Sequence, residues 1–199
     1  MKSQSLLVLL LCGCVYVLGC KPEATETKTE TVEAPPPTMT KQDSIKRGQY
    51  MVTVMGCSDC HSPKIFTPTG EMLFDTTRLL SGHPGGPQPT LAKKHSTTPM
   101  EGLVFSADLT SFIGPWGHSY SANLTPDVTG LGEWTFDQFR KVITEGKFHG
   151  LDGGRPIMPP MPWFNFKHLT NEDMHMIWTY LRSIPPIKNK VPDYIPPTK

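Results

Sequence analysis

Residues 57–61 read Cys-Ser-Asp-Cys-His, and this pattern constrains the fold more than any other feature of the chain. Cysteines three positions apart lie on one face of a helical turn, so both sulfur atoms can reach the two vinyl groups of one porphyrin. The next residue, His61, can then bind the iron from the proximal side. A C-x-x-C-H pattern is typical of c-type haem attachment. The sequence therefore predicts one covalent haem c, bound through Cys57 and Cys60, with His61 as an axial ligand of the iron.

Two other kinds of site are built on paired cysteines. A thioredoxin-like dithiol requires a β-α-β context, which is absent from the pattern around residue 57. A Cys/His zinc site requires a second ligand pair at a matching spacing, and no such pair stands out in the sequence. Haem attachment is the interpretation that the spacing favours.

The N-terminal residues predict export and a lipid anchor. Lys2 and the apolar runs at residues 6–11 and 15–18 have the layout of a signal sequence, and the runs are short for a membrane span. Residues 17–20 read Val-Leu-Gly-Cys, which resembles the lipobox of a bacterial lipoprotein signal. That resemblance implies a signal peptide at residues 1–19 and a lipidated Cys20. The alternatives are a second box at residues 11–14, an uncleaved anchor helix and an ordinary signal peptide cut elsewhere.

A tether is expected to follow Cys20. Residues 21–41 mix Thr with charged residues, include three consecutive prolines and offer almost nothing to bury. Such a segment does not offset its ordering entropy, so we expect it to be disordered and to give the anchored domain reach. The predicted organisation is the lipidated cysteine and tether at residues 20–41 and one domain at residues 42–199. That domain is expected in the periplasm or another extracytoplasmic space, held to a bacterial membrane by lipid.

Three helices are predicted in the domain. The first starts at Asp43 or Ser44 and has Gly48 on its buried face. The second starts at Thr135, where Thr135 and Gln138 form a capping-box pattern, and ends at Gly146; the third starts at Thr170 and stops before Pro185. Residues 62–133 are rich in Gly, Pro, Ser and Thr and show no alternation that indicates a sheet. We therefore expect an all-α domain with long loops wrapped around one haem.

The sixth iron ligand is expected in a proline-rich loop near residue 160. Met161 lies between Pro160 and Pro162, and prolines stiffen a loop that would hold the thioether at the iron. Met158 is the alternative, followed by a histidine or an open position. The remaining histidines are expected on the surface or in loops: His83, His95, His118, His149, His168 and His175.

Residues 44 to about 187 resemble a monohaem c-type cytochrome domain. The resemblance rests on Arg-Gly-Gln-Tyr at residues 47–50, the C-x-x-C-H pattern, Ala-Asn-Leu-Thr-Pro-Asp at 122–127 and Met-Pro-Pro-Met-Pro-Trp at 158–163. Such domains occur as bacterial electron carriers and as haem units of dehydrogenase cytochrome subunits. The resemblance implies a cytochrome c-like helical domain and points to Met161 as the second axial ligand. Two features depart from it: those subunits carry several C-x-x-C-H motifs where this chain has one, and residues 62–121 exceed what a minimal cytochrome needs.

Aromatic and polar residues near these motifs are candidates for contact with the porphyrin. Four aromatic residues are expected to pack on it: Trp116, Trp134, Trp163 and Phe164. Three residues could hydrogen-bond its propionates: Asn123, Arg78 and Arg155. Ordinary packing or a surface position is the alternative for each of them.

Charge and motif content narrow the function. The chain has 19 basic and 18 acidic residues, so it lacks the basic footprint of a nucleic-acid-binding protein. It has no glycine-rich nucleotide loop and no nucleophile elbow. We therefore expect an electron carrier and not an enzyme, with redox partners such as a dehydrogenase or quinol-oxidising complex and a terminal oxidase. The alternatives are a haem subunit of an oxidoreductase complex and an open-site haem sensor or enzyme.

Overall fold

The structure is a computed structural model that describes residues 39–85 and 103–197, all within one compact unit, Thr38–Lys199. The predicted signal peptide at residues 1–19, the lipidated Cys20 and the tether up to residue 38 lie outside the described residues. Within the described ranges, no helix has both the length and the apolar character needed to cross a membrane.

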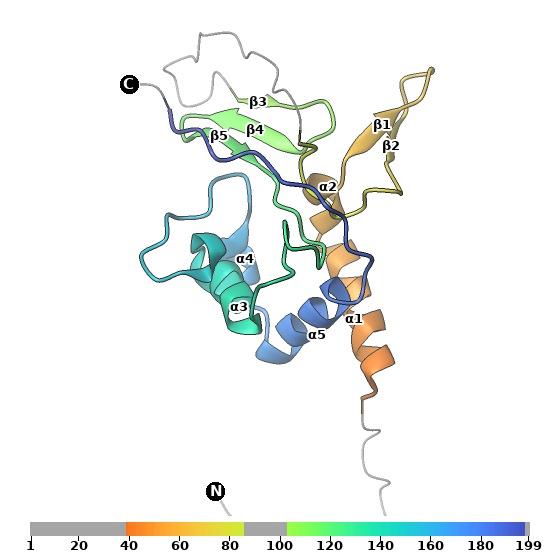
Figure 1. The fold of residues 1–199 in the computed structure, drawn as a ribbon, viewed down its shortest axis with the longest axis vertical. Coiled ribbons are helices and arrows are strands. Elements are labelled where there is room, and N and C mark those ends of the chain that lie inside the picture. Colours follow the sequence, from red (N-terminus) through yellow and green to blue (C-terminus); the bar gives the residue numbers. More distant parts are fainter. Residues whose placement is uncertain (1–38, 86–102, 198–199) are drawn as a thin grey trace, which may run out of the picture. The chain divides into compact units, whose positions relative to one another are not determined.

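The described residues form short helices and short strands (Figure 1). The helical segments are α1 (Lys41–Val54), α2 (Cys57–His61), α3 (Phe136–Glu145), the 3-10 turn η1 (Phe148–Gly150), α4 (Trp163–Phe166) and α5 (Asn171–Leu181). The strands are β1 (Lys64–Phe66), β2 (Met72–Phe74), β3 (Val104–Phe105), β4 (Ser111–Gly114) and β5 (Gly117–Tyr120).

Helices α1 and α5 cross closely at Gly48. A Cβ atom added at Gly48 would lie 2.0 Å from the carbonyl oxygen of Met176 and 2.8 Å from the Cβ of Tyr180. Only a residue without a side chain allows this approach. The predicted close packing at Gly48 is confirmed. The core that these helices enclose with α3 consists of Met51, Val52, Leu80, Leu131, Phe139, Ile143, Met174, Ile177 and Leu181.

The starts of the helices follow their capping residues. The capping box of Thr135 and Gln138 is present at α3, and Thr170 caps α5 through the amide of Asp173, so both of these predictions are confirmed. Helix α1 starts earlier than predicted, because Thr40 is its N-cap. The carboxylate of Asp43 bonds back to the Thr40 amide, so Asp43 occupies the third helical position instead of the cap.

The prediction of an all-α domain is wrong. Strands β1 and β2 form one antiparallel pair, and β3, β4 and β5 form a three-stranded antiparallel sheet. Each strand has two to four residues, too few to show a period of two in the sequence. Both faces of the β1–β2 ribbon are exposed and apolar, with Ile65 opposite Leu73 and Phe66 opposite Met72, so the usual alternation of polar and apolar residues is absent.

The last described residues form an extended segment, residues 185–197, which we call the C-terminal strap (Figure 1, dark blue). The amide of Ile187 donates to Thr125 Oγ1 at 3.1 Å. The side-chain amide of Asn189 donates to the carbonyl oxygens of Ser81 and His83 at 2.7 and 2.8 Å. Ile195 pairs with His118 of β5. The strap therefore joins the loop after β2, the loop after β5 and β5 itself.

Candidate functional site

The two cysteines of the C-S-D-C-H pattern lie on the five-residue helix α2. Gly56 precedes this helix with a left-handed backbone (φ 68°), which a glycine adopts without steric cost. Cys57 and Cys60 are free thiols, both half-buried, and Cys57 packs against the hydrophobic core. The helical turn thus carries both cysteines, and Cys57 is the one of the two that contacts the core.

The thiols have the character of buried groups. Burial raises the pKa of Cys57 to about 11, and it also raises the pKa of Cys60. Dithiol oxidoreductases instead lower the pKa of a reactive cysteine with nearby positive charge or a helix N-terminus. This setting does not favour a thioredoxin-like dithiol.

Residues 39–85 and 103–197 contain no group of three or more His, Cys, Asp or Glu side chains able to hold a metal ion.

His61 is held in one orientation by a backbone carbonyl. Its Nδ1 lies 2.7 Å from the carbonyl oxygen of Ala122, and because a carbonyl only accepts, Nδ1 carries the proton. Burial lowers the pKa of His61, which favours the neutral imidazole. Nε2 makes no hydrogen bond within the described part of the chain. A neutral ring with a bonded Nδ1–H and an available Nε2 is the form in which histidine binds a metal.

The acceptor for His61 belongs to a loop that is closed by its own hydrogen bonds, residues 122–132. The side-chain oxygen of Asn123 accepts from the amide and the hydroxyl of Thr125, at 2.9 and 2.8 Å. The side-chain nitrogen of Asn123 donates to the Ile187 carbonyl in the C-terminal strap at 2.9 Å. The Leu131 amide closes the loop on the Thr125 carbonyl at 2.9 Å. These bonds give the Ala122 carbonyl a fixed position.

Met161 reaches the same core as Cys57. It lies in the proline-rich loop at residues 156–163, which we call the Met161 loop, and it is half-buried against the core cluster. Met158 is half-buried but is not among the residues packed on that cluster. The loop is bonded at its start, where the Ile157 amide donates to the Gly146 carbonyl at 2.7 Å, and at Pro159, whose carbonyl accepts from Ser119 Oγ at 2.7 Å.

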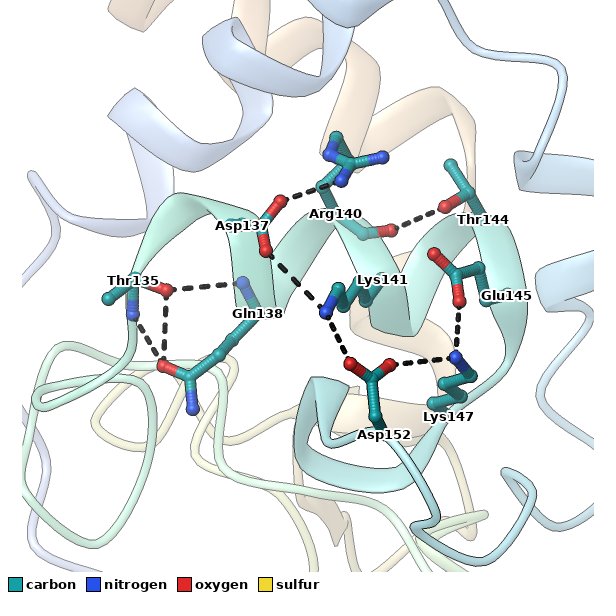
Figure 2. A network of polar contacts seen from close by, with 9 residues as sticks. All are labelled: Thr135, Asp137, Gln138, Arg140, Lys141, Thr144, Glu145, Lys147 and Asp152. Atoms are coloured by element: carbon teal, nitrogen blue, oxygen red, sulfur yellow. Dashed lines mark hydrogen bonds and ion pairs between the residues drawn. The ribbon is translucent and has the colours of Figure 1, made fainter.

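An ion-pair network holds the segment before the Met161 loop against α3 (Figure 2). Asp152 accepts from Lys141 on α3 at 3.2 Å and from Lys147 at 2.9 Å. Lys147 also pairs with Glu145 at 2.7 Å. The backbone of this segment closes as well, because the Phe148 amide donates to the Arg155 carbonyl at 2.9 Å. The polypeptide that leads into the Met161 loop is therefore bonded at both ends.

The aromatic candidates for haem packing occupy different places. Trp134 packs against the core cluster. Trp163 lies over Gly146, where an added Cβ would be 2.3 Å from its ring, and the exposed Phe164 packs edge-on against Trp163. Trp116 lies in the β4–β5 hairpin, where its indole N–H donates to Ser119 Oγ at 3.1 Å. Of the four aromatic candidates, only Trp134 packs against the core cluster that Cys57 and Met161 also contact.

The candidate propionate partners have protein contacts of their own. Asn123 is buried and bonded within its loop and to the strap. Arg78 donates to the Asn189 side-chain oxygen at 3.3 Å. The Arg155 guanidinium lies 3.7 Å from the centre of the Phe148 ring and 4.8 Å from that of Tyr194.

The histidines at positions 83 and 118, expected on the surface or in loops, are both buried: His83 lies in a loop, and His118 lies in strand β5. Nδ1 of His83 lies 2.7 Å from Thr110 Oγ1, and Nδ1 of His118 lies 2.8 Å from the Tyr120 hydroxyl. No sequence pattern indicated this burial, because the strand that carries His118 is only four residues long. The exposed histidines are His149, His168 and His175, and His95 lies outside the described residues.

The donor set fits a c-type haem. Cys57 and Met161 pack against one hydrophobic cluster, Cys60 shares the helical turn of Cys57, and His61 keeps Nε2 available at the end of that turn. Two thiols, one imidazole and one thioether are the groups by which such a haem is attached and ligated. The described residues thus include the kinds of donor group that a c-type haem requires.

No protein-family profile matches the chain. It is 26% identical to the fructose dehydrogenase cytochrome subunit of Gluconobacter japonicus over 149 residues, which is 74% of this chain and 22% of that protein. It is 26% identical to the gluconate 2-dehydrogenase cytochrome c subunit of Pantoea cypripedii over 137 residues, 68% of this chain and 22% of that protein. It is 36% identical to the cytochrome c subunit of the quinone-dependent alcohol dehydrogenase of Gluconacetobacter polyoxogenes over 101 residues, 48% of this chain and 20% of that protein. The chain thus spans less than a quarter of each of these relatives, and the similarity to cytochrome subunits of dehydrogenases supports the prediction of a c-type cytochrome domain.

Proposed function

We propose that this chain binds one haem c covalently and transfers single electrons between redox proteins outside the cytoplasm. The observation that carries the proposal is His61 at the end of the C-S-D-C-H helix, with its Nδ1 proton bonded to Ala122 and its Nε2 available. The similarity to cytochrome subunits of dehydrogenases supports the same conclusion. The haem supplies one-electron exchange between ferric and ferrous iron.

The residues of α2 would attach and ligate the haem. Cys57 and Cys60 would each form a thioether bond by addition of the thiol S–H across one vinyl group of the porphyrin. His61 would bind the iron through Nε2, while the Ala122 carbonyl keeps the proton on Nδ1 and fixes the plane of the ring. Attachment through two side chains lets a small domain hold a haem whose edge stays open to a partner.

Met161 is the proposed second axial ligand. Its contact with the core cluster that Cys57 also joins supports Met161 over Met158, which lacks that contact. A His/Met pair raises the reduction potential and fills the coordination sphere of the iron. The protein would then act by exchanging electrons and would not bind peroxide, oxygen or nitric oxide at the iron.

The proposed location follows from the N-terminal sequence. Cys20 would be lipidated after removal of residues 1–19, and residues 20–41 would link the domain to the membrane. Replacement of Cys20 by Ser in the full chain tests this, because the variant should leave the membrane fraction and its N-terminal peptide should lose the mass of the acyl chains. An unchanged distribution between membrane and soluble fractions would reject the anchor.

A stable subunit of a dehydrogenase complex is the second candidate function. The names of the relatives favour it, since the fructose and alcohol dehydrogenase proteins are subunits. A free carrier would meet its donors and acceptors, such as a dehydrogenase or quinol-oxidising complex and a terminal oxidase, through small transient contacts. Purification of the full chain from its native membrane separates the two, because a subunit retains a dehydrogenase polypeptide at a fixed ratio and a carrier does not.

An optical spectrum tests the proposed function. The full chain, made in a host that matures c-type haem, should contain haem that resists extraction by acid and organic solvent, and a Cys57→Ala/Cys60→Ala variant should contain none. The oxidised protein should show the weak far-red band of a Met–iron bond. Met161→Ala should lose this band, lower its potential and bind carbon monoxide, whereas Met158→Ala should keep the spectrum of the unmodified protein. Absence of covalent haem would reject the function, and loss of the band in Met158→Ala alone would reassign the ligand.

A further inference from the structure

The Met161 loop has few backbone groups with which to hold its shape. Four of its eight positions are prolines, which have no N–H to donate: Pro156, Pro159, Pro160 and Pro162. The Ile157 amide bonds to Gly146 at the start of the loop, and the Trp163 amide bonds back to the Met161 carbonyl. Among the described residues, a single hydrogen bond links residues 158–161 to a residue outside the loop, and it runs from Ser119 Oγ to the Pro159 carbonyl at 2.7 Å.

The hydroxyl group of Ser119 is well placed for this bond. Ser119 is buried in β5, and its oxygen accepts from the Trp116 indole N–H at 3.1 Å. The Phe112 carbonyl lies farther from this oxygen, at 3.3 Å, so the hydroxyl group donates its one proton to the nearer Pro159 carbonyl. A hydroxyl that accepts one hydrogen bond becomes a stronger donor in the next. The indole, the hydroxyl and the carbonyl thus form a short chain of hydrogen bonds.

The strand that carries Ser119 is fixed on both sides. It pairs with β4 along its length, from Ser111 opposite Tyr120 to Gly114 opposite Gly117. On its other side Ile195 of the C-terminal strap exchanges backbone hydrogen bonds with His118, at 2.8 and 3.0 Å. A side chain on this strand therefore has little freedom to follow a moving loop.

Ser119 and Ala122 lie three residues apart, and they contact the two segments that carry the proposed iron ligands, the Met161 loop and helix α2. Ala122 accepts the Nδ1 proton of His61, and Ser119 donates to the loop that contains Met161. We propose that Ser119 is a positioning residue for the distal ligand, which holds the Met161 loop so that the thioether stays on the iron. This inference rests on the proposed function, because it takes Met161 as the ligand. It also gives one residue of the stretch at 62–121, which exceeds what a minimal cytochrome needs, a role in holding the ligand.

Removal of the hydroxyl group tests the inference in the full chain with haem. Ser119→Ala leaves the Pro159 carbonyl and the Trp116 N–H without their partner. We expect the far-red Met–iron band to weaken or disappear, the potential to fall, and carbon monoxide to bind the reduced protein about tenfold faster. A factor of ten corresponds to about 1.4 kcal/mol, which is within the range of one hydrogen bond. The peptide that covers residues 157–163 should also exchange its amide hydrogens faster.

Two matched variants complete the experiment. Ser119→Thr keeps a hydroxyl at the same position and should restore the band and the slow carbon monoxide binding. Ser111→Ala removes a buried hydroxyl from the neighbouring strand β4 and should leave both unchanged. If Ser119→Ala loses stability in urea but keeps the band and the carbon monoxide rate, Ser119 is only structural and the inference is rejected. If the unmodified protein itself has covalent haem but no Met–iron band, the ligand assignment is rejected together with this inference.

Discussion

The carbonyl oxygen of Ala122 lies 2.7 Å from Nδ1 of His61, which precedes it by 61 residues. This bond decides which ring nitrogen carries the proton and therefore which one is available to iron. A backbone group serves this purpose reliably only if its own loop is fixed. Hydrogen bonds of Asn123 to Thr125 and to the strap residue Ile187 fix this loop. The orientation of His61 therefore depends on the side chain that follows Ala122 in the sequence.

Asn123→Ala should destabilise the protein. Asn123 is 3% exposed, and loss of its side chain leaves the buried Thr125 amide without a partner. It also removes one hydrogen bond each from the Thr125 hydroxyl and the Ile187 carbonyl, which keep their contact with each other at 3.3 Å. We expect the free energy of unfolding in urea to fall by about 2–4 kcal/mol, since a buried unpaired group costs about 1–3 kcal/mol and each lost hydrogen bond about 1 kcal/mol. Asn165→Ala on the exposed face of α4 is the control and should change it by less than about 0.5 kcal/mol. Equal effects of the two variants would contradict the role given to Asn123.

Gly48→Ala should separate helices α1 and α5. Within an exposed helix this change usually stabilises, because glycine has the greater freedom in the unfolded chain. Here the added Cβ would lie 2.0 Å from the Met176 carbonyl oxygen, so the two helices must move apart. We expect a loss of about 2–3 kcal/mol in urea unfolding, typical of an overpacked core. Gln49→Ala, at the exposed neighbouring position, should be within about 0.5 kcal/mol of the unmodified protein.

Thr135→Ala should weaken the start of α3. Thr135 Oγ1 accepts a hydrogen bond from the backbone amide of Gln138 at 3.2 Å. In return, Gln138 Oε1 accepts one from the backbone amide of Thr135 at 2.9 Å (Figure 2). Removal of such an N-cap costs about 1 kcal/mol. Thr135→Ser retains the hydroxyl and should recover most of that loss in thermal or urea unfolding. If serine and alanine behave alike, the capping bond does not stabilise α3.

The ion pairs of Asp152 predict a pH dependence of stability. Hydrogen bonds from Lys147 and Lys141 lower the pKa of the Asp152 carboxyl below its ordinary value of 3.8. In the unfolded chain this group titrates near 3.8, so the folded state gains from the network above that pH and loses the gain as the pH falls through the lowered pKa. The stability difference between the unmodified protein and Asp152→Asn should therefore shrink below pH 3.8.

Urea unfolding midpoints of the two proteins, measured from neutral to acidic pH, check this prediction. Added salt provides a second test at neutral pH, because about 1 M salt shortens the Debye length to about 3 Å and should reduce the same difference. A difference that stays constant over the whole pH range would show that the Asp152 charge does not contribute.

The helices were predictable because their signals are local. The capping pattern of Thr135 and Gln138, the Gly146 at the end of α3 and the Thr170 cap of α5 each act within a few residues. The motif at residues 57–61 also defines its own helical turn. Helix α1 also begins at a capping box, but this box is formed by Thr40 and Asp43 and lies about one turn earlier than the predicted start.

The strands and the supports of the site were not predictable in the same way. Strands β4 and β5 pair with each other, and β5 also pairs with Ile195 in the strap, which is a contact between distant parts of the chain. The partner of His61 is a backbone oxygen, which no side-chain pattern reveals. Ser119 becomes visible only when the Met161 loop is placed beside β5. The sequence motifs thus indicate the side chains that would contact a haem, whereas the residues that support those side chains are found only from the tertiary structure.

The C-terminal strap has a consequence for where the chain can be shortened. Ile187 and Asn189 lie far along the sequence from His61, yet they bond to the loop that carries Ala122. A chain that stopped before Ile187 would lack these hydrogen bonds, and the carbonyl group that orients His61 would lose part of its support.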